Sequence, residues 1–213
     1  MLLMVGLGNP GPEHARQRHN IGFMALDAIH AAGGFGPWRA RYQGYLAEQQ
    51  GGGPDRALLL KPLTYMNESG RSVGEAVRFL KIAPERVVVF HDEMDLKPGK
   101  VKVKSGGGAA GHNGLRSLDA AIGQGYRRVR LGIGHPGDRD RVLGYVLQNF
   151  AKAEQPWLDR LLAACAAHWP LLAEGRDNMF MTRLAEAVFP PPPPKPKPAA
   201  PPPAASDTPP PEC

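Results

Sequence analysis

Short apolar runs and helical patterns alternate along most of the chain. Residues 2–7 and 87–90 are nearly continuous apolar runs, as expected for strands buried on both faces of a sheet. Residues 21–32 and 69–80 instead repeat apolar side chains at the spacing of a helix. Strands that alternate with helices in this way predict an α/β fold.

The remaining patterns extend this prediction. Residues 42–49 and 56–61 predict two strands that form a hairpin around the turn at 51–55. Residues 101–104 alternate valine with lysine, so the valines should face the core and the lysines the solvent. The sequence also predicts a short helix around Leu115 and Leu118, a strand at 126–133, and helices at 154–173 and 177–188, while the apolar segment 142–147 fits no single type.

The composition changes near the end of the chain. Thirteen of the 23 prolines lie in residues 190–213, where almost no large apolar side chain accompanies them. Such a segment cannot bury enough surface to offset the entropy lost on ordering. We therefore predict one domain over residues 1–188, followed by a disordered proline-rich tail over residues 189–213.

Charge and cysteine content limit the class of partner and the compartment. Lysine and arginine outnumber aspartate and glutamate by 26 to 20, and the net charge of +6 favours an anionic partner. Cys165 and Cys213 have no metal-binding spacing and form no plausible disulfide framework, so we expect a cytoplasmic protein. No apolar run approaches the length of a membrane span, and no basic segment marks a signal peptide.

Glycines at positions 6, 8 and 11 follow the first predicted strand and match the dinucleotide-binding pattern. That pattern requires a helix to begin within the glycine loop, so that its N-terminal amides contact the pyrophosphate. Pro10 and Pro12 obstruct such a helix, and the helical pattern begins only at residue 21. The segment therefore argues against a nucleotide cofactor, and a turn without a ligand is the simpler interpretation of these residues alone.

Polar residues at the ends of predicted elements are the candidates for chemistry. Asn9 follows the first strand, His19 precedes the first helix, for which Asn20 is a candidate N-cap, and Asp92 follows the strand at 87–90. Ligands of open α/β sheets bind at the carboxyl ends of the strands. A neutral imidazole can take a proton from water, and a carboxylate on its other ring nitrogen fixes the tautomer. No serine or cysteine lies in the sequence context of a catalytic nucleophile, so we expect water to be the nucleophile.

Other loop residues allow a functional or a structural interpretation. Asn67 and Asn113 are neutral amides that can hold a polarised carbonyl without adding charge, although a loop asparagine is often only a turn residue. His112 can be a helix cap, and Met66 can line a pocket or fill the core. The cluster His91-Asp92-Glu93-x-Asp95 suggests a metal site, but adjacent residues of an extended chain point to opposite faces, so we expect no metal.

Basic residues gather in two predicted strands. Lys102 and Lys104 lie in one strand, and Arg127, Arg128 and Arg130 lie in the other. A solvated strand face accounts for many such charges, but their number also predicts contacts to phosphates. Phosphate contacts give affinity without base specificity, which an enzyme acting on many RNA sequences requires.

Five motifs together resemble bacterial peptidyl-tRNA hydrolases. They occur in order within residues 5–147 and cover most of the predicted domain but none of the tail: Gly8-Asn9-Pro10-Gly11 with Arg18-His19-Asn20-x-Gly22, Lys61-Pro62-x-Thr64-Tyr65-Met66-Asn67-x-Ser69-Gly70, His91-Asp92-Glu93-x-Asp95, Gly106-Gly107 with Gly111-His112-Asn113-Gly114, and Arg130-x-Gly132-Ile133-Gly134-His135-Pro136. Any one of these motifs is weak, whereas the ordered set is specific.

The resemblance implies a monomeric α/β domain with a twisted mixed sheet between helices. It implies hydrolysis of the ester between a nascent peptide and the 3′ ribose of tRNA, without metal or cofactor. By motif match, His19 would be the general base that activates water, and Asp92 its orienting partner. Lys104 and Arg130 match the pair that clamps the tRNA 5′ phosphate, and the substrate-binding set would comprise Asn9, His14, Met66, Asn67, His112 and Asn113.

Two positions depart from the family pattern, which usually has tyrosine at position 14 and threonine at position 17. This chain has His14 and Gln17 there, so the substrate contact associated with the tyrosine is changed. An alternative function is a non-catalytic RNA-binding protein with a vestigial pocket. The basic strands support that alternative, but the intact pair of His19 and Asp92 argues against it.

Overall fold

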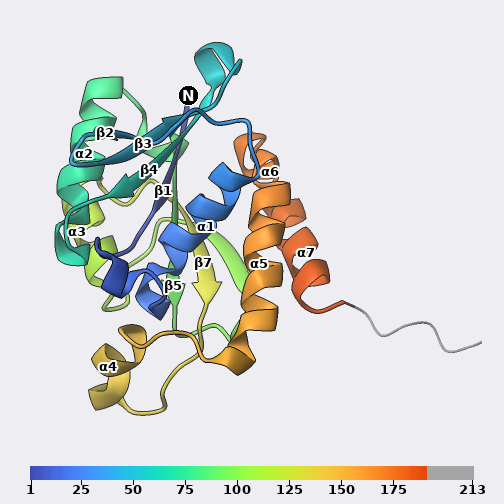
Figure 1. Ribbon diagram of the computed structural model, residues 1–213. Coiled ribbons are helices and arrows are strands. Elements are labelled where there is room, and N and C mark those ends of the chain that lie inside the picture. Colours follow the sequence, from blue (N-terminus) through green and yellow to red (C-terminus); the bar gives the residue numbers. More distant parts are fainter. Residues whose placement is uncertain (191–213) are drawn as a thin grey trace, which may run out of the picture.

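A seven-stranded sheet forms the centre of the computed structural model, which describes residues 1–190 apart from the side chains at positions 54 and 139 (Figure 1). Its strands are β1 (Leu2–Gly6), β2 (Arg39–Arg41), β3 (Gly44–Glu48), β4 (Ala57–Pro62), β5 (Val87–Glu93), β6 (Val101–Ser105) and β7 (Arg127–Gly132). The order in space is β2-β3-β4-β1-β5-β7-β6. The four central strands are parallel and the others antiparallel, which confirms the mixed sheet.

Helices cover both faces of the sheet (Figure 1). One face carries α1 (Ile21–Ala31), α5 (Gln155–His168), α6 (Pro170–Ala173) and α7 (Asp177–Val188). The other face carries α2 (Ser69–Leu80) and α3 (Asn113–Ile122). The short helix α4 (Val142–Val146) lies beyond the carboxyl ends of β5 and β7. No helix in residues 1–190 is both long and apolar enough to span a bilayer.

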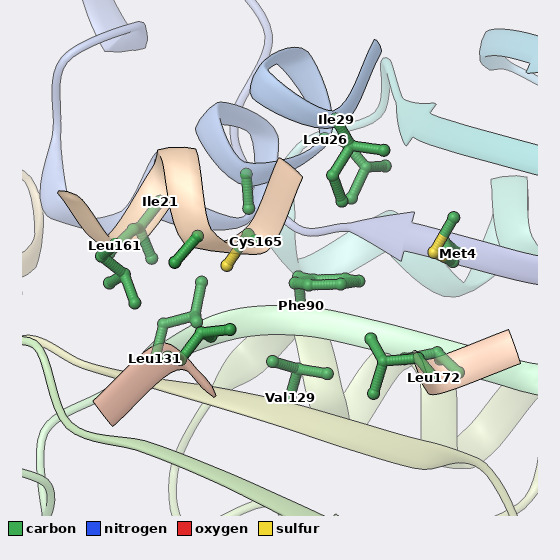
Figure 2. Close-up of a cluster of buried hydrophobic side chains, with 14 of the residues drawn as sticks. Met4, Ile21, Leu26, Ile29, Phe90, Val129, Leu131, Leu161, Cys165 and Leu172 are labelled. Atoms are coloured by element: carbon green, nitrogen blue, oxygen red, sulfur yellow. The ribbon is translucent and has the colours of Figure 1, made fainter. Parts of the chain in front are cut away.

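The strand side chains alternate between two apolar clusters, one on each face of the sheet. Figure 2 shows the cluster beneath α1 and α5, where Phe90 packs among Met4, Val129, Leu26 and Cys165. The intervening residues of β1 and β5 are equally buried beneath α2 and α3. This burial on both faces confirms the prediction for residues 2–7 and 87–90.

A close approach between α1 and the sheet fixes the position of the residues that precede the helix. A Cβ atom at Gly22 would lie 2.3 Å from the carbonyl oxygen of Phe90 and 2.6 Å from the backbone nitrogen of Leu7. Only glycine fits there, so the first turn of α1 rests directly on strand backbone. His19, three residues earlier, is thereby held at the carboxyl edge of the sheet.

Several boundaries differ from the sequence predictions. β5 continues to Glu93 because its last three residues pair with residues 130–132 of β7, so Asp92 lies within the strand rather than after it. The helix predicted at 154–173 is divided at Trp169, since Pro170 has no N–H to continue the hydrogen bonds. Strand β2 was not predicted, and the uncertain segment 142–147 contains α4. Most of the predicted tail, residues 191–213, lies outside the described residues.

Candidate active site

Four segments meet at the carboxyl edge of the parallel strands. The 3-10 turn η2 (Arg18–Asn20) carries His19, the end of β5 carries Asp92, and the residue before α3 is His112. These residues line a cavity of about 240 Å³, and α4 forms an apolar wall of the same cavity.

His19 and Asp92 form a hydrogen-bonded pair. The Nδ1 atom of His19 lies 2.9 Å from Oδ1 of Asp92, and the His19 side chain retains 13% of its exposure. With its Nδ1 proton donated to the carboxylate, the neutral ring keeps a free lone pair on Nε2. Burial lowers the pKa of His19, but the charge and hydrogen bond of Asp92 outweigh it, so the pKa lies above its usual value of 6.5.

His112 donates a second hydrogen bond to the same carboxylate oxygen. Its Nδ1 accepts hydrogen bonds from the backbone N–H groups of Gly114 and Leu115, at 3.1 and 3.3 Å, and so caps α3. The ring proton must therefore sit on Nε2, which lies 3.0 Å from Oδ1 of Asp92. Burial raises the pKa of Asp92, but the two imidazoles outweigh it and hold the pKa well below the usual range. His112 is therefore both the cap of α3 and a residue of the site.

The same three side chains meet the distance requirement for a metal site. One ligand atom each from His19, Asp92 and His112 lies within 4.8 Å of the others. A metal on His112 would need Nε2 without its proton, yet Nδ1 is already the hydrogen-bond acceptor of the α3 cap. The ring would have to become an imidazolate or give up both capping bonds, so the donor set fits a metal poorly.

Asn9 is fixed by three hydrogen bonds. Its backbone N–H and C=O bond to the side chain of Asn20, both at 2.9 Å, so Asn20 does not cap α1 with its side chain as the sequence suggested. Oδ1 of Asn9 accepts a hydrogen bond from the backbone N–H of Met66 at 2.9 Å. Because Oδ1 is occupied, the Nδ2 group of Asn9 is left to donate to a ligand.

The remaining predicted substrate-binding residues have different settings. Asn113 lines the cavity and is exposed, and Asn67 is exposed in the turn η4 (Met66–Glu68). Met66 is buried, and a Cβ atom at Gly114 would lie only 2.5 Å from its sulfur, so its side chain packs against the start of α3. His14 lies in the turn η1 (Pro12–His14), with Nδ1 3.0 Å from Oε1 of Gln17. The two positions that depart from the family pattern therefore contact each other.

Lys104 and Arg130 line a second cavity of about 170 Å³, formed on β6 and β7. Both side chains are accessible, as phosphate contacts require. Arg127 and Arg128, which the sequence placed in the same basic group, have other partners. Arg127 bonds to Asp177 and to the carbonyl of Leu172, and the buried Arg128 bonds to Asp119 and to the carbonyl of Gly108.

Three features of the site have partners or positions that the sequence did not predict. The α4 wall consists of Val142, Leu143 and Val146, whose apolar run gave no sign of its place. Glu93 forms an ion pair with Arg130, at 2.7 Å between Oε2 and Nε. His91 donates from Nδ1 to the carbonyl of Asp92 at 2.7 Å, and burial together with His112 lowers its pKa to about 3, so it is neutral at pH 7. Alternation along β5 places His91 and Glu93 on one face, but only strand register identifies their partners.

The fold and cavity define an α/β protein with a histidine–carboxylate pair in a pocket at the sheet edge, an arrangement typical of enzymes that activate water. The chain matches the family model described as peptidyl-tRNA hydrolase over residues 3–191. It therefore belongs to the peptidyl-tRNA hydrolase family.

Similar proteins agree with this assignment. A peptidyl-tRNA hydrolase of Rhodospirillum centenum is 58% identical over 191 residues, which cover 90% of this chain and 84% of the relative. One from Paracoccus denitrificans is 60% identical over 190 residues, which cover 89% and 80%. The crystal structure of peptidyl-tRNA hydrolase from Acinetobacter baumannii superposes with a TM-score of 0.76 at 38% identity, covering 86% of this chain and 94% of that one.

Proposed function

We propose that this chain hydrolyses the ester between peptide and tRNA in peptidyl-tRNA, using a water molecule that His19 activates. Family membership supports the reaction, which releases free tRNA and peptide. The observation that carries the mechanism is the hydrogen bond from His19 Nδ1 to Asp92, because it leaves Nε2 as the only free base on the ring.

The proposed reaction has two steps. Nε2 of His19 takes a proton from water as the water oxygen bonds to the ester carbonyl carbon, and Asp92 stabilises the imidazolium that forms. The tetrahedral intermediate then breaks its bond to the ribose 3′ oxygen. The imidazolium returns the proton to that oxygen, so the peptide leaves as a carboxylic acid and the tRNA with a free hydroxyl.

Neutral donors around the cavity suit the charge that develops on the carbonyl oxygen. The side chain of Asn113, which lines the cavity, and the free Nδ2 of Asn9, which is not part of the lining, are proposed to position the peptide and the attacking water. Asn67, His14, Met66 and His112 complete the proposed substrate-binding set, with Met66 and His112 acting mainly by holding the site together.

The second cavity accounts for the RNA part of the substrate. Lys104 and Arg130 are proposed to bind the 5′ phosphate of tRNA, where Coulomb attraction gives affinity independent of base sequence. We further propose a cytoplasmic monomer that needs neither metal nor cofactor. The protonation state of His112 supports the absence of a metal.

Release of the blocked amino acid from N-acetylaminoacyl-tRNA tests the mechanism. In His19→Ala the rate should fall by about 10²–10⁴-fold, the usual contribution of a general base, with or without a chelator. His168→Ala, at the far end of α5, is the matched control and should retain wild-type activity. Full activity of His19→Ala would remove His19 from the mechanism, and no release by the wild type would favour a non-catalytic RNA-binding protein.

A further inference from the structure

Glu93 lies between the two cavities and lines both of them. It directly follows Asp92 in β5, so the two carboxylates belong to opposite faces of the strand. The Glu93 side chain is only 10% exposed. A carboxylate buried to this degree requires partners for its charge.

Both oxygens of Glu93 have a fixed partner. Oε2 accepts a hydrogen bond from Nε of Arg130 at 2.7 Å, and Oε1 accepts one from the backbone N–H of Asp95 at 3.1 Å. Within residues 1–190, the terminal Nη1 and Nη2 groups of Arg130 donate no hydrogen bond. The guanidinium is therefore held by its inner nitrogen while its outer fork remains available.

Among the other charged side chains that line this cavity in the described chain, only Lys104 has no ion-pair partner. Arg128 is neutralised by Asp119, and the buried His91 has no hydrogen-bond partner for Nε2. A Cβ atom at Gly107 would lie 3.0 Å from Nζ of Lys104, so this ammonium lies against the glycine loop. No carboxylate of the described chain lies within 4.0 Å of Lys104. Within residues 1–190, Glu93 is the only acidic residue that lines this second cavity.

We propose that Glu93 is a positioning residue for phosphate recognition, which holds Arg130 so that Nη1 and Nη2 form a ready-made fork for the terminal 5′ phosphate of tRNA. Two parallel N–H donors match two phosphate oxygens, so a fixed fork loses less freedom on binding than a mobile arginine. The same carboxylate reduces the positive charge of the cavity. Glu93 thus favours an anion that fits the fork over anions attracted by charge alone. This inference rests on the proposed contact of Lys104 and Arg130 with the 5′ phosphate.

Substrates with and without the 5′ phosphate isolate this role. We would measure kcat/KM on N-acetylaminoacyl-tRNA carrying either a 5′ phosphate or a 5′ hydroxyl, and take the ratio as the phosphate preference. Glu93→Ala should reduce the preference on the order of tenfold, as expected when a charge-assisted contact loses its geometry. Glu93→Gln keeps one acceptor oxygen for the two donors Arg130 Nε–H and Asp95 N–H, so it should lower the preference by less than Glu93→Ala does. Glu186→Ala, in an exposed pair on α7, is the control.

A double-mutant cycle with Arg130→Ala gives the decisive result. If Glu93 acts through Arg130, replacing Glu93 has no further effect on the phosphate preference in the Arg130→Ala background. A preference that survives in Glu93→Ala but is lost in Arg130→Ala would overturn the role of Glu93 and leave the phosphate contact intact. No preference in the wild type would overturn both. A loss in Glu93→Ala that is equal on the two substrates would assign Glu93 a structural role instead.

Discussion

At the scale of single residues, one carboxylate oxygen determines the protonation of the site. Oδ1 of Asp92 accepts from both His19 and His112, and each of these imidazoles has one ring nitrogen committed to it. The pKa of Asp92 is held well below its usual range, so the carboxylate stays charged whenever His19 is neutral. The proposed base is thus prepared before the substrate binds.

Asp92→Asn should change both the rate and its pH dependence. His19 must be neutral to accept a proton, so activity should rise as the pH passes its pKa, which lies above 6.5 in the wild type. Without the Asp92 charge, burial dominates and the pKa of His19 falls, so the rise should occur at lower pH. The rate should also fall by about 10²–10⁴-fold. Profiles of kcat/KM from about pH 5 to about pH 9 test this, with Asp159→Asn on the surface of α5 as the control. An unchanged midpoint would contradict the pairing.

The individual residues of the site could be predicted from the sequence better than their hydrogen-bond and ion-pair partners. His19 was detectable because it directly precedes a predicted helix, and Asp92 because it directly follows a predicted strand. The bond between Glu93 and Arg130 was not, because it joins neighbouring strands whose register no local pattern gives. The pairing of Arg128 with Asp119 of α3 was likewise not detectable, because it joins a strand to a helix that packs on it.

At the scale of elements, Arg18 joins the turn that carries His19 to the segment that forms the cavity wall. Its guanidinium donates to the carbonyl of Asn149 at 3.0 Å and pairs with Glu154 at 2.6 Å, and it lies 4.4 Å from the ring centre of Tyr145. Its backbone N–H also donates to the carbonyl of Gln148. Helix α4, gold in Figure 1, is therefore attached to η2 although more than 120 residues separate them in the chain.

Arg18→Ala should loosen this attachment. It leaves Glu154 without its charged partner and removes the hydrogen bond to the carbonyl of Asn149, so we expect a loss of about 3 kcal/mol in the free energy of unfolding. Amide exchange in residues 142–150 should accelerate more than exchange in β1 or β5. Arg183→Ala, which breaks an exposed pair on α7, should change stability by less than about 0.5 kcal/mol. Exchange that accelerates equally throughout the chain would contradict a local attachment.

The sequence predicted long elements well and short or interrupted ones poorly. β1, α1 and α2 have clear apolar periodicity, and their predicted positions are confirmed. β2 has three exposed residues, Arg39–Arg41, so it has no apolar pattern and exists only through its pairing with β3. The end of β5 likewise depends on β7, which lies 34 residues further along the chain.

At the scale of the whole molecule, the order of the seven strands could not be read from the sequence, because it depends on which crossovers pack best. What the sequence did provide was the class: buried parallel strands that alternate with amphipathic helices. The domain boundary at residue 188 stays a prediction, as does the disorder of the tail. The fold also buries His91 near the carboxyl end of β5, against the ring of His112. This burial should make the stability of the domain depend on pH.

His91 should make the folded domain sensitive to acid. Burial and His112 lower its pKa from 6.5 to about 3, so between these values the unfolded chain binds one more proton than the folded one. Stability should therefore fall with decreasing pH across this window, with a contribution of about 1.4 kcal/mol per pH unit. His91→Asn removes the titrating group and should flatten the curve, measured by urea unfolding at each pH. An equally steep curve in the variant would show that another group is responsible.

The protonation of the His19 ring is the most direct test of the account. Nitrogen-15 NMR of the labelled protein should show a neutral ring with its proton on Nδ1, hydrogen-bonded to Asp92, and a titration midpoint above 6.5. This midpoint should coincide with the midpoint of the rise in kcat/KM. A neutral ring protonated on Nε2, or a midpoint unrelated to the activity profile, would contradict His19 as the base that activates water.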